Sequence, residues 1–310
     1  MNVVREPRLN GSELKARVVD FAKRASVEIT THEEGSVPEL LEGLAFGTTI
    51  YVAHTPGATL DQVVRVARKV EASGFRASPH IVARRLQDDR TLKAALRSLR
   101  DGGVEQVLLV AGDRHHPVGN FSSTLDLLDT GYLVEHGFKR IGVCGHPEGN
   151  SAISETTLWR ALKQKQEFAD RSHVKLHIVT QFGFDPEAIC AWDGKLKEHG
   201  ISLPVHVGLA GPTPLPLLIK FAMQCGIGAS LRALMRHMSA MSNITRLATS
   251  PDEMVIGLLN CGASAGSSSI VQPHFFSLGG AVATLGWLRA VAAGAFEMPE
   301  DEGKFVMNLE

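Results

Sequence analysis

The chain has 310 residues, of which 44% are hydrophobic and 21% are charged, and its formal net charge at pH 7 is −1. This composition is typical of a globular enzyme built from two small domains or from one α/β barrel. A net charge so close to zero gives no reason to expect nucleic acid or an anionic membrane surface as the partner.

The N-terminal stretch carries charges where a signal peptide needs an apolar core. The most apolar stretch near the C-terminus, residues 278–296, contains Arg289 and several glycines, so we expect no membrane span. The four cysteines, at positions 144, 190, 225 and 261, are far apart and form no CxxC motif. We therefore expect four reduced thiols in a cytoplasmic protein.

Short apolar runs alternate with longer amphipathic stretches along the chain. The expected strands cover residues 26–31, 49–54, 77–83, 106–113, 140–146, 175–181, 204–211 and 274–278. Apolar residues recur at helical spacing over 59–73 and 88–100, with Thr59 and Asp88 at the N-cap positions. Gly74 and Gly102 stand where these two helices should end, and Asp185-Pro186 should begin another.

Eight strands, each followed by a helix, predict a (β/α)8 TIM barrel that forms a single catalytic domain over residues 1–310. We expect an N-terminal helix, extra helices at 231–242 and 251–260, and a Gly/Ser loop at 262–269 before strand eight. A doubly wound sheet is the alternative, but the glycine-rich GxGxxG turn typical of that fold does not occur. The apolar helices at 215–241 and 281–296 suit either a homo-oligomer interface or the outer ring of the barrel.

Ligands of TIM barrels bind at the carboxyl ends of the strands. The residues expected there have few charges and many imidazole and amide groups: Glu28, His54, Thr55, His80, Asp113, His146, Gln181, residues 211–213 and Phe276. A phosphoryl-transfer site would need clustered Lys and Arg, and a glycosidase would need two opposed carboxylates, for which only Glu28 and Asp113 qualify.

Metal and nucleophile chemistry have weaker support. His115 and His116 are neighbours whose side chains diverge on an extended loop, and no HxH or HExxH motif occurs. A metal-dependent hydrolase using His54, His80, His146 and Asp113 stays open as a hypothesis, although its site would have a single carboxylate. No GxSxG motif is present, and no Ser or Cys stands beside a base at a strand end.

The remaining strand-end residues suit a planar heterocycle. Gln181 offers both a donor and an acceptor, and Glu28 could protonate a ring nitrogen if its environment raised its pKa. The alternative is that both residues are merely polar caps on their strands.

The stretch VTQFGFD, residues 179–185, resembles the TQxxFD signature of the methylenetetrahydrofolate reductase family. Further stretches resemble family motifs in the same order: SVE (26–28), SPHIVAR (78–84), LLVAGD (108–113), GVCGHPEGN (142–150) and HFFSLGG (274–280). The resemblance covers nearly the whole chain and implies a divergent short form, a TIM barrel without the regulatory C-terminal domain of the long forms.

The resemblance implies an oxidoreductase that interconverts 5,10-methylenetetrahydrofolate and 5-methyltetrahydrofolate, with FAD relaying a hydride from NADH or NADPH. Glu28 would be the general acid, Asp113 would stabilise the developing cation near the flavin, and Gln181 would hold the pterin edge. Phe184 and Phe276 would also contact the substrate. The implied FAD-binding residues are His54, Thr55, His80, Ala111, Gly112, Asp113, Phe121, Ser122, Ser123, His146 and Lys165.

Several positions depart from the family pattern. Ala111 stands where the family has an arginine, His146 replaces a tyrosine, and Phe276 and Gly280 replace a tyrosine and an arginine. Three interpretations stay open: FAD bound through other contacts, a flavin-free reductase with direct hydride transfer, or a folate-binding barrel without turnover. The sequence fixes neither the choice between NADH and NADPH nor the direction of the reaction.

Overall fold

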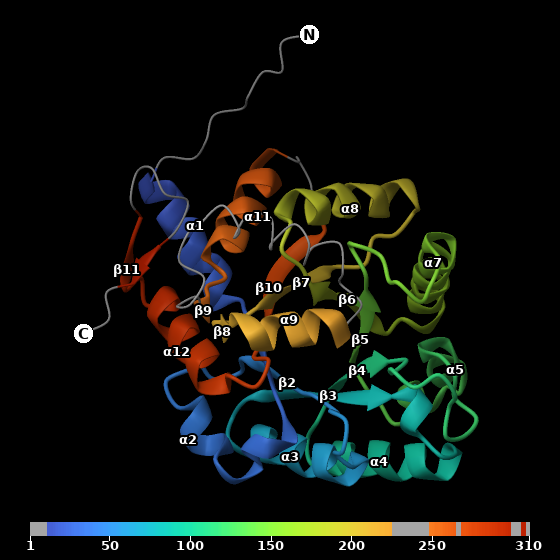
Figure 1. Ribbon diagram of the computed structural model, residues 1–310. Helices are drawn as coiled ribbons and strands as arrows, with labels where there is room; N and C mark the ends of the chain where they lie inside the picture. The colour runs from blue at the N-terminus through green and yellow to red at the C-terminus, as the bar shows by residue number, and fades with distance from the viewer. Residues whose placement is uncertain (1–10, 225–247, 265–267, 299–304, 308–310) are drawn as a thin grey trace.

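The computed structural model describes residues 11–224, 248–264, 268–298 and 305–307. Eight parallel strands close into a barrel in the order β1-β10-β7-β6-β5-β4-β3-β2, which confirms the TIM barrel (Figure 1). Its strands are β1 (Ser26–Ile29), β2 (Thr49–Val52), β3 (Arg76–Val82), β4 (Gln106–Val110), β5 (Arg140–Gly145), β6 (Lys175–Phe182), β7 (Val205–Ala210) and β10 (Ile270–Phe276).

Helices surround the barrel, and α1 (Gly11–Lys23) precedes the first strand as expected. The others are α2 (Val37–Leu41), α3 (Leu60–Ala72), α4 (Asp89–Asp101), α5 (Thr124–Asp129), α6 (Tyr132–Glu135), α7 (Glu155–Ser172), α8 (Pro186–Glu198), α9 (Leu215–Gln224), α11 (Asp252–Ser264) and α12 (Ala281–Ala292). There are also two short 3-10 helices, η1 (Thr31–Gly35) and η2 (Ala83–Arg85). Four two-residue strands lie outside the barrel: β8 (Thr213–Pro214), β9 (Ala248–Thr249), β11 (Phe296–Glu297) and β12 (Val306–Met307).

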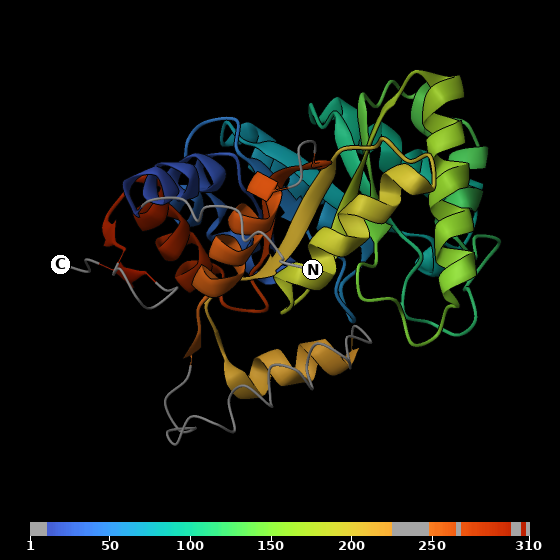
Figure 2. The ribbon, with the colours of Figure 1, turned by 90° about the horizontal axis from the view of Figure 1, so that it is seen from above.

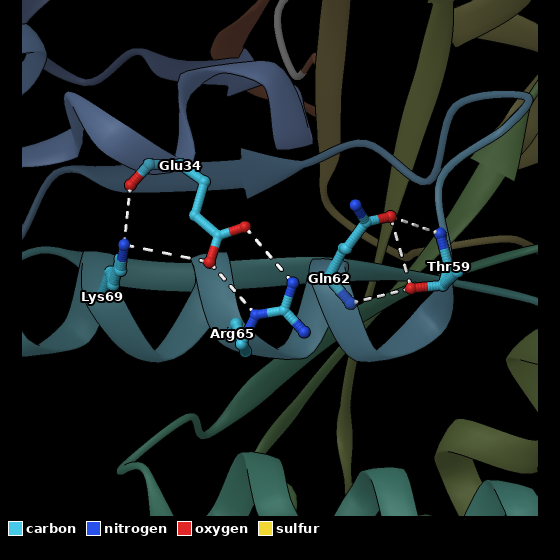
Figure 3. Close-up of polar contacts among 5 residues, drawn as sticks. All are labelled: Glu34, Thr59, Gln62, Arg65 and Lys69. Atoms are coloured by element: carbon cyan, nitrogen blue, oxygen red, sulfur yellow. Dashed lines mark hydrogen bonds and ion pairs between the residues drawn. The ribbon is translucent and has the colours of Figure 1, made fainter.

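The helix starts lie where the capping residues predict them. Thr59 and Gln62 form a reciprocal capping box at the start of α3, while Asp88 and Asp185 accept backbone N–H groups at α4 and α8. Figure 3 shows this capping box and, one and two turns further along α3, the side chains of Arg65 and Lys69 around Glu34 of η1. These contacts fasten the loop that follows β1 to α3.

Several strand boundaries differ from the expected ones. β1 and β2 stop at Ile29 and Val52, each two residues early, β4 stops at Val110, three residues early, and β10 begins at Ile270 rather than at His274. Thr30 leaves β1 because its side chain and backbone bond to Glu33 as the N-cap of η1. Of the extra helices expected before strand eight, 251–260 corresponds to α11, and 231–242 lies outside the described residues.

Alternation along each strand places polar side chains inside the barrel. On β1, Val27 and Ile29 belong to the core between strands and helices, while Ser26 and Glu28 alternate with them. Tyr51, Leu108, Val179 and Val110 form a small apolar cluster apart from the main core. A TIM-barrel interior is usually filled by branched apolar residues, so the polar groups of this interior need a specific account.

The loop after β7 leads into α9, which crosses in front of the barrel in Figure 1 and lies beyond the strand ends in Figure 2. Leu218 and Ala222 of α9 form a buried cluster with Phe182 and Leu278, against which Phe184 and Phe276 pack. Helix α9 therefore covers the mouth of the barrel on the side of β6, β7 and β10.

One expectation about the cysteines is wrong. Cys190 on α8 and Cys261 on α11 form a disulfide, with their Cα atoms 6.5 Å apart, whereas Cys144 is free among the described cysteines and position 225 lies outside the described residues. The pairing was not predictable from the sequence because the two residues are 71 positions apart and meet only when α8 and α11 pack side by side. Within the described residues, no helix has the length and apolar character needed to cross a membrane.

Candidate functional site

Glu28 and His80 meet inside the barrel. Oε2 of Glu28 lies 3.4 Å from Nε2 of His80, and each side chain is only 12% exposed. β1 and β3 are both neighbours of β2 in the barrel, and Glu28 and Ser78 are register partners of the same residue, Tyr51. Two residues predicted separately as the acid and a cofactor contact are thus brought together by the topology.

Burial keeps both groups neutral at pH 7. Desolvation, assisted by the charge of Glu33, raises the pKa of Glu28 to about 8. Desolvation, assisted by His54, lowers the pKa of His80 to about 3. The contact is therefore not an ion pair at neutral pH: the proton stays on the Glu28 carboxyl group, beside an imidazole that carries no charge.

Deeper in the barrel, three more histidines surround Tyr51. The Tyr51 hydroxyl lies 2.9 Å from Nε2 of His177 and 3.4 Å from Nδ1 of His206, and these two imidazoles stack with centroids 4.1 Å apart. His274 packs on the Tyr51 ring at 4.4 Å and bonds to Ser26 through Nδ1 at 3.0 Å. Sequence reasoning missed this network, although its members occupy the same alternating face of their strands as Glu28 and His80.

Burial lowers the pKa of each of these histidines. Desolvation, with the charge of Arg140, lowers the pKa of His206 to about 4, and desolvation together with the neighbouring imidazoles holds the pKa values of His177 and His274 well below the ordinary value. These three imidazoles are therefore uncharged at neutral pH.

Arg85 organises the other side of the mouth. Its Nη1 donates to the carbonyl oxygens of His54 and Thr55 at 2.6 and 2.9 Å, and its Nη2 lies 3.1 Å from Oδ1 of Asp113. This one side chain, 15% exposed, links the loops after β2, β3 and β4. Sequence reasoning missed Arg85 because it follows the end of β3 by three residues and nothing in its neighbours marks it as inward-facing.

Asp113 lies at the rim rather than deep in the barrel, with 61% of its side chain exposed. Partial burial alone would raise its pKa, but the hydrogen bond from Arg85 and the charges of Arg85 and Arg114 outweigh burial and hold the pKa below its ordinary value. Asp113 is therefore an anion at neutral pH while Glu28 is a neutral acid. The two predicted catalytic carboxyl groups have opposite protonation states for identifiable reasons.

The cleft beside Arg85 has a volume of about 640 Å³. Its walls come from the loops after β2, β3 and β4 and include His54, Thr59, Arg85, Asp113, Arg114 and Val118. Such a volume falls within the range of small-molecule and cofactor sites in proteins.

A β-bulge sets the position of Gln181. β6 pairs with β7 at Val179–His206 and again at Phe182–Gly208, so that Thr180 and Gln181 together oppose one residue of β7. Thr180 Oγ1 accepts the Gly208 N–H at 2.8 Å and donates to the Gln181 carbonyl at 2.9 Å. The TQ pair of the motif thus builds the bulge and places Gln181 at the end of β6.

The motifs GHPEG and TQFGF lie against each other at the mouth. Pro147 and Glu148 line a small hollow with Gln181, and a Cβ at Gly183 would lie 2.5 Å from Oε1 of Glu148. Phe184 and Phe276, the other expected substrate contacts, belong to the apolar cluster of α9. The mouth therefore has an apolar half at β6, β7 and β10 and a charged half at β2, β3 and β4.

Three expected cofactor residues already have other contacts. The Phe121 side chain is 4% exposed and lies in the main hydrophobic core. Ser122 and Ser123 both donate to Asp126, and Ser123 is the N-cap of α5. These three residues hold the loop after β4 in place.

Other expected cofactor positions are small or buried. Ala111 and Gly112 form the turn after β4, where Gly112 has a φ of 100° and a Cβ would meet Val82 at 2.6 Å. Desolvation, with the charge of Lys165, lowers the pKa of His146 to about 4. Lys165 is itself 6% exposed, and desolvation lowers its pKa beside Cys144.

The described residues contain no side-chain cluster that would support the metal-site hypothesis. Among the residues that the structure describes, no group of three or more His, Cys, Asp and Glu side chains is arranged to hold a metal ion. His54, His80, His146 and Asp113 do not come together in such a group.

No protein-family model matches the chain. Among solved structures, it is similar to a protein of Burkholderia cenocepacia J2315 that is provisionally described as a lyase/mutase. The two share 12% sequence identity with a TM-score of 0.47 over 89% of this chain and 87% of that chain. A similarity at this level carries no information about activity.

Proposed function

We propose that this protein is an oxidoreductase that interconverts 5,10-methylenetetrahydrofolate and 5-methyltetrahydrofolate, with NADH or NADPH as hydride donor and FAD as relay. The observation that carries the proposal is the neutral carboxyl group of Glu28, buried at the end of β1 with a pKa of about 8. A carboxylic acid that keeps its proton at pH 7 is suited to general acid catalysis.

Glu28 would donate its proton to the nitrogen that leaves the methylene bridge. The C–N bond breaks as that nitrogen takes the proton, and the one-carbon unit becomes an iminium cation that accepts a hydride to form the methyl group. The neutral His80 beside Glu28 does not compete for the proton, since its own pKa is about 3. The anionic Asp113 would stabilise the developing positive charge from the rim.

The two halves of the mouth suit the parts of such a substrate. Gln181 can pair with the edge of a pterin through its amide, while Phe184 and Phe276 offer aromatic faces beside α9. A hydride transfer needs the reacting rings to be stacked away from water, and the apolar half of the mouth provides such a surface.

FAD, when bound, would supply the two-electron relay between the nicotinamide and the one-carbon unit. His54 provides one test of fit: its Nε2 faces the Ala58 carbonyl at 3.1 Å, and its buried Nδ1 has no hydrogen-bond partner within the described part of the chain. The unpaired Nδ1 can accept a hydrogen bond from a hydroxyl group such as those of the ribityl chain. Thr55, Ala111, Gly112 and Asp113 surround the same side of the mouth and would bind the flavin.

A flavin-free reductase, in which NAD(P)H passes its hydride directly to the folate, is the second candidate. The observation in its favour concerns three residues expected to bind FAD. Phe121 is packed in the core, and Ser122 and Ser123 donate hydrogen bonds to Asp126 at the start of α5. A folate-binding barrel without turnover is the third interpretation, and steady turnover would exclude it.

The absorption spectrum of the purified protein separates the two enzyme forms, since bound flavin has a band near about 450 nm. Oxidation of NADH or NADPH is then followed with methylenetetrahydrofolate present and absent. A yellow protein with folate-dependent turnover supports the FAD form, and a colourless protein with the same turnover supports direct transfer. No turnover and no folate binding would reject the proposed function.

A further inference from the structure

The cleft between the loops after β2, β3 and β4 is built by two consecutive arginines. Arg85 fixes the loop after β2 through the His54 and Thr55 carbonyls and reaches Asp113 on the loop after β4. Arg84 holds the rest of the loop after β4. Its Nη1 donates to the Arg114 carbonyl at 2.9 Å and its Nε donates to the Ser122 carbonyl at 2.8 Å. The walls of the cleft are thus held by hydrogen bonds between strand-end segments, not by one mobile loop.

The charges of the cleft do not cancel. Asp113 is paired with Arg85, whereas the exposed Arg114 guanidinium forms no hydrogen bond or ion pair with any residue that the structure describes. His54 is neutral at pH 7, since desolvation and the charge of Arg85 lower its pKa. Among the residues that the structure describes, the charged groups lining the cleft are therefore two arginines and one aspartate, an excess of one positive charge.

The other residues that line the cleft indicate what kind of ligand carries the negative charge. Pro56, Ala58, Leu60 and Val118 give the cleft an apolar part, and Thr59, Gln87 and Thr91 add polar groups. A free inorganic ion would leave most of the 640 Å³ and the apolar wall unused. The shape and charge instead suit an organic ligand with an anionic end.

We propose that this cleft binds the phosphate or carboxylate end of a ligand, with Arg114 as the residue that contacts the anion and Arg84 and Arg85 as residues that position it. The inference rests on the proposed function for its two candidate sources: the phosphates of a dinucleotide and the glutamyl carboxylates of a folate. Both present the same chemistry to a guanidinium group, and binding experiments separate them.

The test uses fragments that need no turnover. ADP-ribose represents the phosphate source, p-aminobenzoyl-glutamate represents the carboxylate source, and 4-aminobenzamide is the neutral control. Binding of each is measured by isothermal titration calorimetry at low and at raised salt for the wild type, Arg114→Ser and Arg97→Ser. Arg97 is a matched control because it is also exposed, lies on α4 away from the cleft lining, and forms no hydrogen bond or ion pair within the described ranges of the chain.

We expect Arg114→Ser to weaken the binding of one anionic fragment about tenfold, the effect of losing one charge-assisted hydrogen bond, and to reduce its salt dependence. Arg97→Ser should leave both unchanged, and the fragment affected identifies the source. Equal affinity of wild type and Arg114→Ser for both anions, or no binding of either, would overturn the proposal. A clear Arg114 effect in a protein without folate-dependent turnover would retain the anion site and reject the proposed function.

Discussion

Glu28 Oε2 lies 3.4 Å from Nε2 of His80, and the shared burial of the two groups moves their pKa values in opposite directions, to about 8 and about 3. Both groups are consequently neutral at pH 7. This arrangement stores a proton on a carboxyl group at the mouth of the barrel without burying a net charge, which would be far more costly than burying the neutral pair.

The first prediction concerns activity. The rate of methylenetetrahydrofolate reduction should fall as pH rises through about 8, because Glu28 then loses the proton that it donates. Glu28→Gln should lower kcat by about 10²–10⁴-fold, since the amide retains the shape of the side chain but supplies no acidic proton. Stopped-flow or steady-state oxidation of NAD(P)H between pH 6 and 10 measures both effects.

Glu33→Gln is the matched control for this experiment. Glu33 contributes a negative charge that helps raise the pKa of Glu28, and a glutamine can still accept the capping hydrogen bonds of Thr30. The variant should remain active, with its alkaline limb shifted to lower pH. Full activity of Glu28→Gln, or a rate independent of pH from 7 to 10, would refute the acid role.

The second prediction concerns conformational stability. His80, His146 and His206 have folded-state pKa values of about 3 to 4, against an ordinary value of 6.5. Below pH 6.5 the unfolded chain binds more protons than the native state, so the free energy of unfolding should decrease as pH falls from 6.5 toward 4. Glu28 acts with the opposite sign over this range, but the several histidines outweigh one carboxyl group.

Above pH 6.5 the histidines still add stability until the unfolded chain has lost its remaining histidine protons, whereas Glu28 acts with the opposite sign. Its folded-state pKa is raised, so its stabilising contribution is complete below pH 4.5 and decreases as pH rises to about 8. Relative to Glu28→Gln, the free energy of unfolding of the wild type should therefore decline by about 1.5 kcal/mol between pH 6.5 and 8. Urea denaturation of both proteins at several pH values checks this difference, and the same pH dependence in the two proteins would show that Glu28 does not cause it.

Much of the fold follows from local patterns in the sequence. Three helix starts were predictable from the capping residues Thr59, Asp88 and Asp185, and the strands were predictable from their apolar runs. Both signals depend on interactions within a few residues of the chain. Strand ends were less predictable. Thr30, for example, leaves β1 because its backbone N–H donates to the Glu33 carboxylate.

The site was predictable only where a residue stands at a strand end. Glu28, His54 and Asp113 could be placed at the mouth from the barrel topology alone. Arg85 could not, because its role depends on carbonyl groups 30 and 31 residues away on another loop. Phe121 shows the converse limit: a residue placed by resemblance to a motif can instead belong to the core that supports the loop.

The third prediction concerns the Cys190–Cys261 disulfide. The chain-entropy model gives a stabilisation of about 4 kcal/mol for a bridge between residues 71 positions apart. Cys261→Ser should therefore lower the free energy of unfolding by several kcal/mol under oxidising conditions. The wild type with reductant should show the same loss, whereas Cys144→Ser, which removes a free thiol, should respond to reductant as the wild type does.

Peptide mapping without reduction checks the pairing itself. It should yield a cross-linked peptide that contains Cys190 and Cys261. Recovery of both cysteines as free thiols from freshly purified, alkylated protein would contradict the pairing, as would equal stability of the wild type with and without reductant.

The last prediction tests the bulge that presents Gln181. A Cβ on Gly208 would lie 2.3 Å from the backbone oxygen of Thr180, and backbone cannot rotate away as a flexible side chain can. Gly208→Ala should thus lower the free energy of unfolding by about 1–3 kcal/mol, the range for overpacked positions, and weaken folate binding because Gln181 shifts with the bulge.

Gly286→Ala on α12 is the control: nothing lies within 4 Å of its Cβ, so the alanine should stabilise the helix by about 0.5–1 kcal/mol and leave binding unchanged. Urea denaturation and fluorescence titration with 5-methyltetrahydrofolate measure the two effects. If Gly208→Ala were as stable as the wild type and bound folate equally well, the close approach of β7 to the TQ bulge would have no part in positioning Gln181.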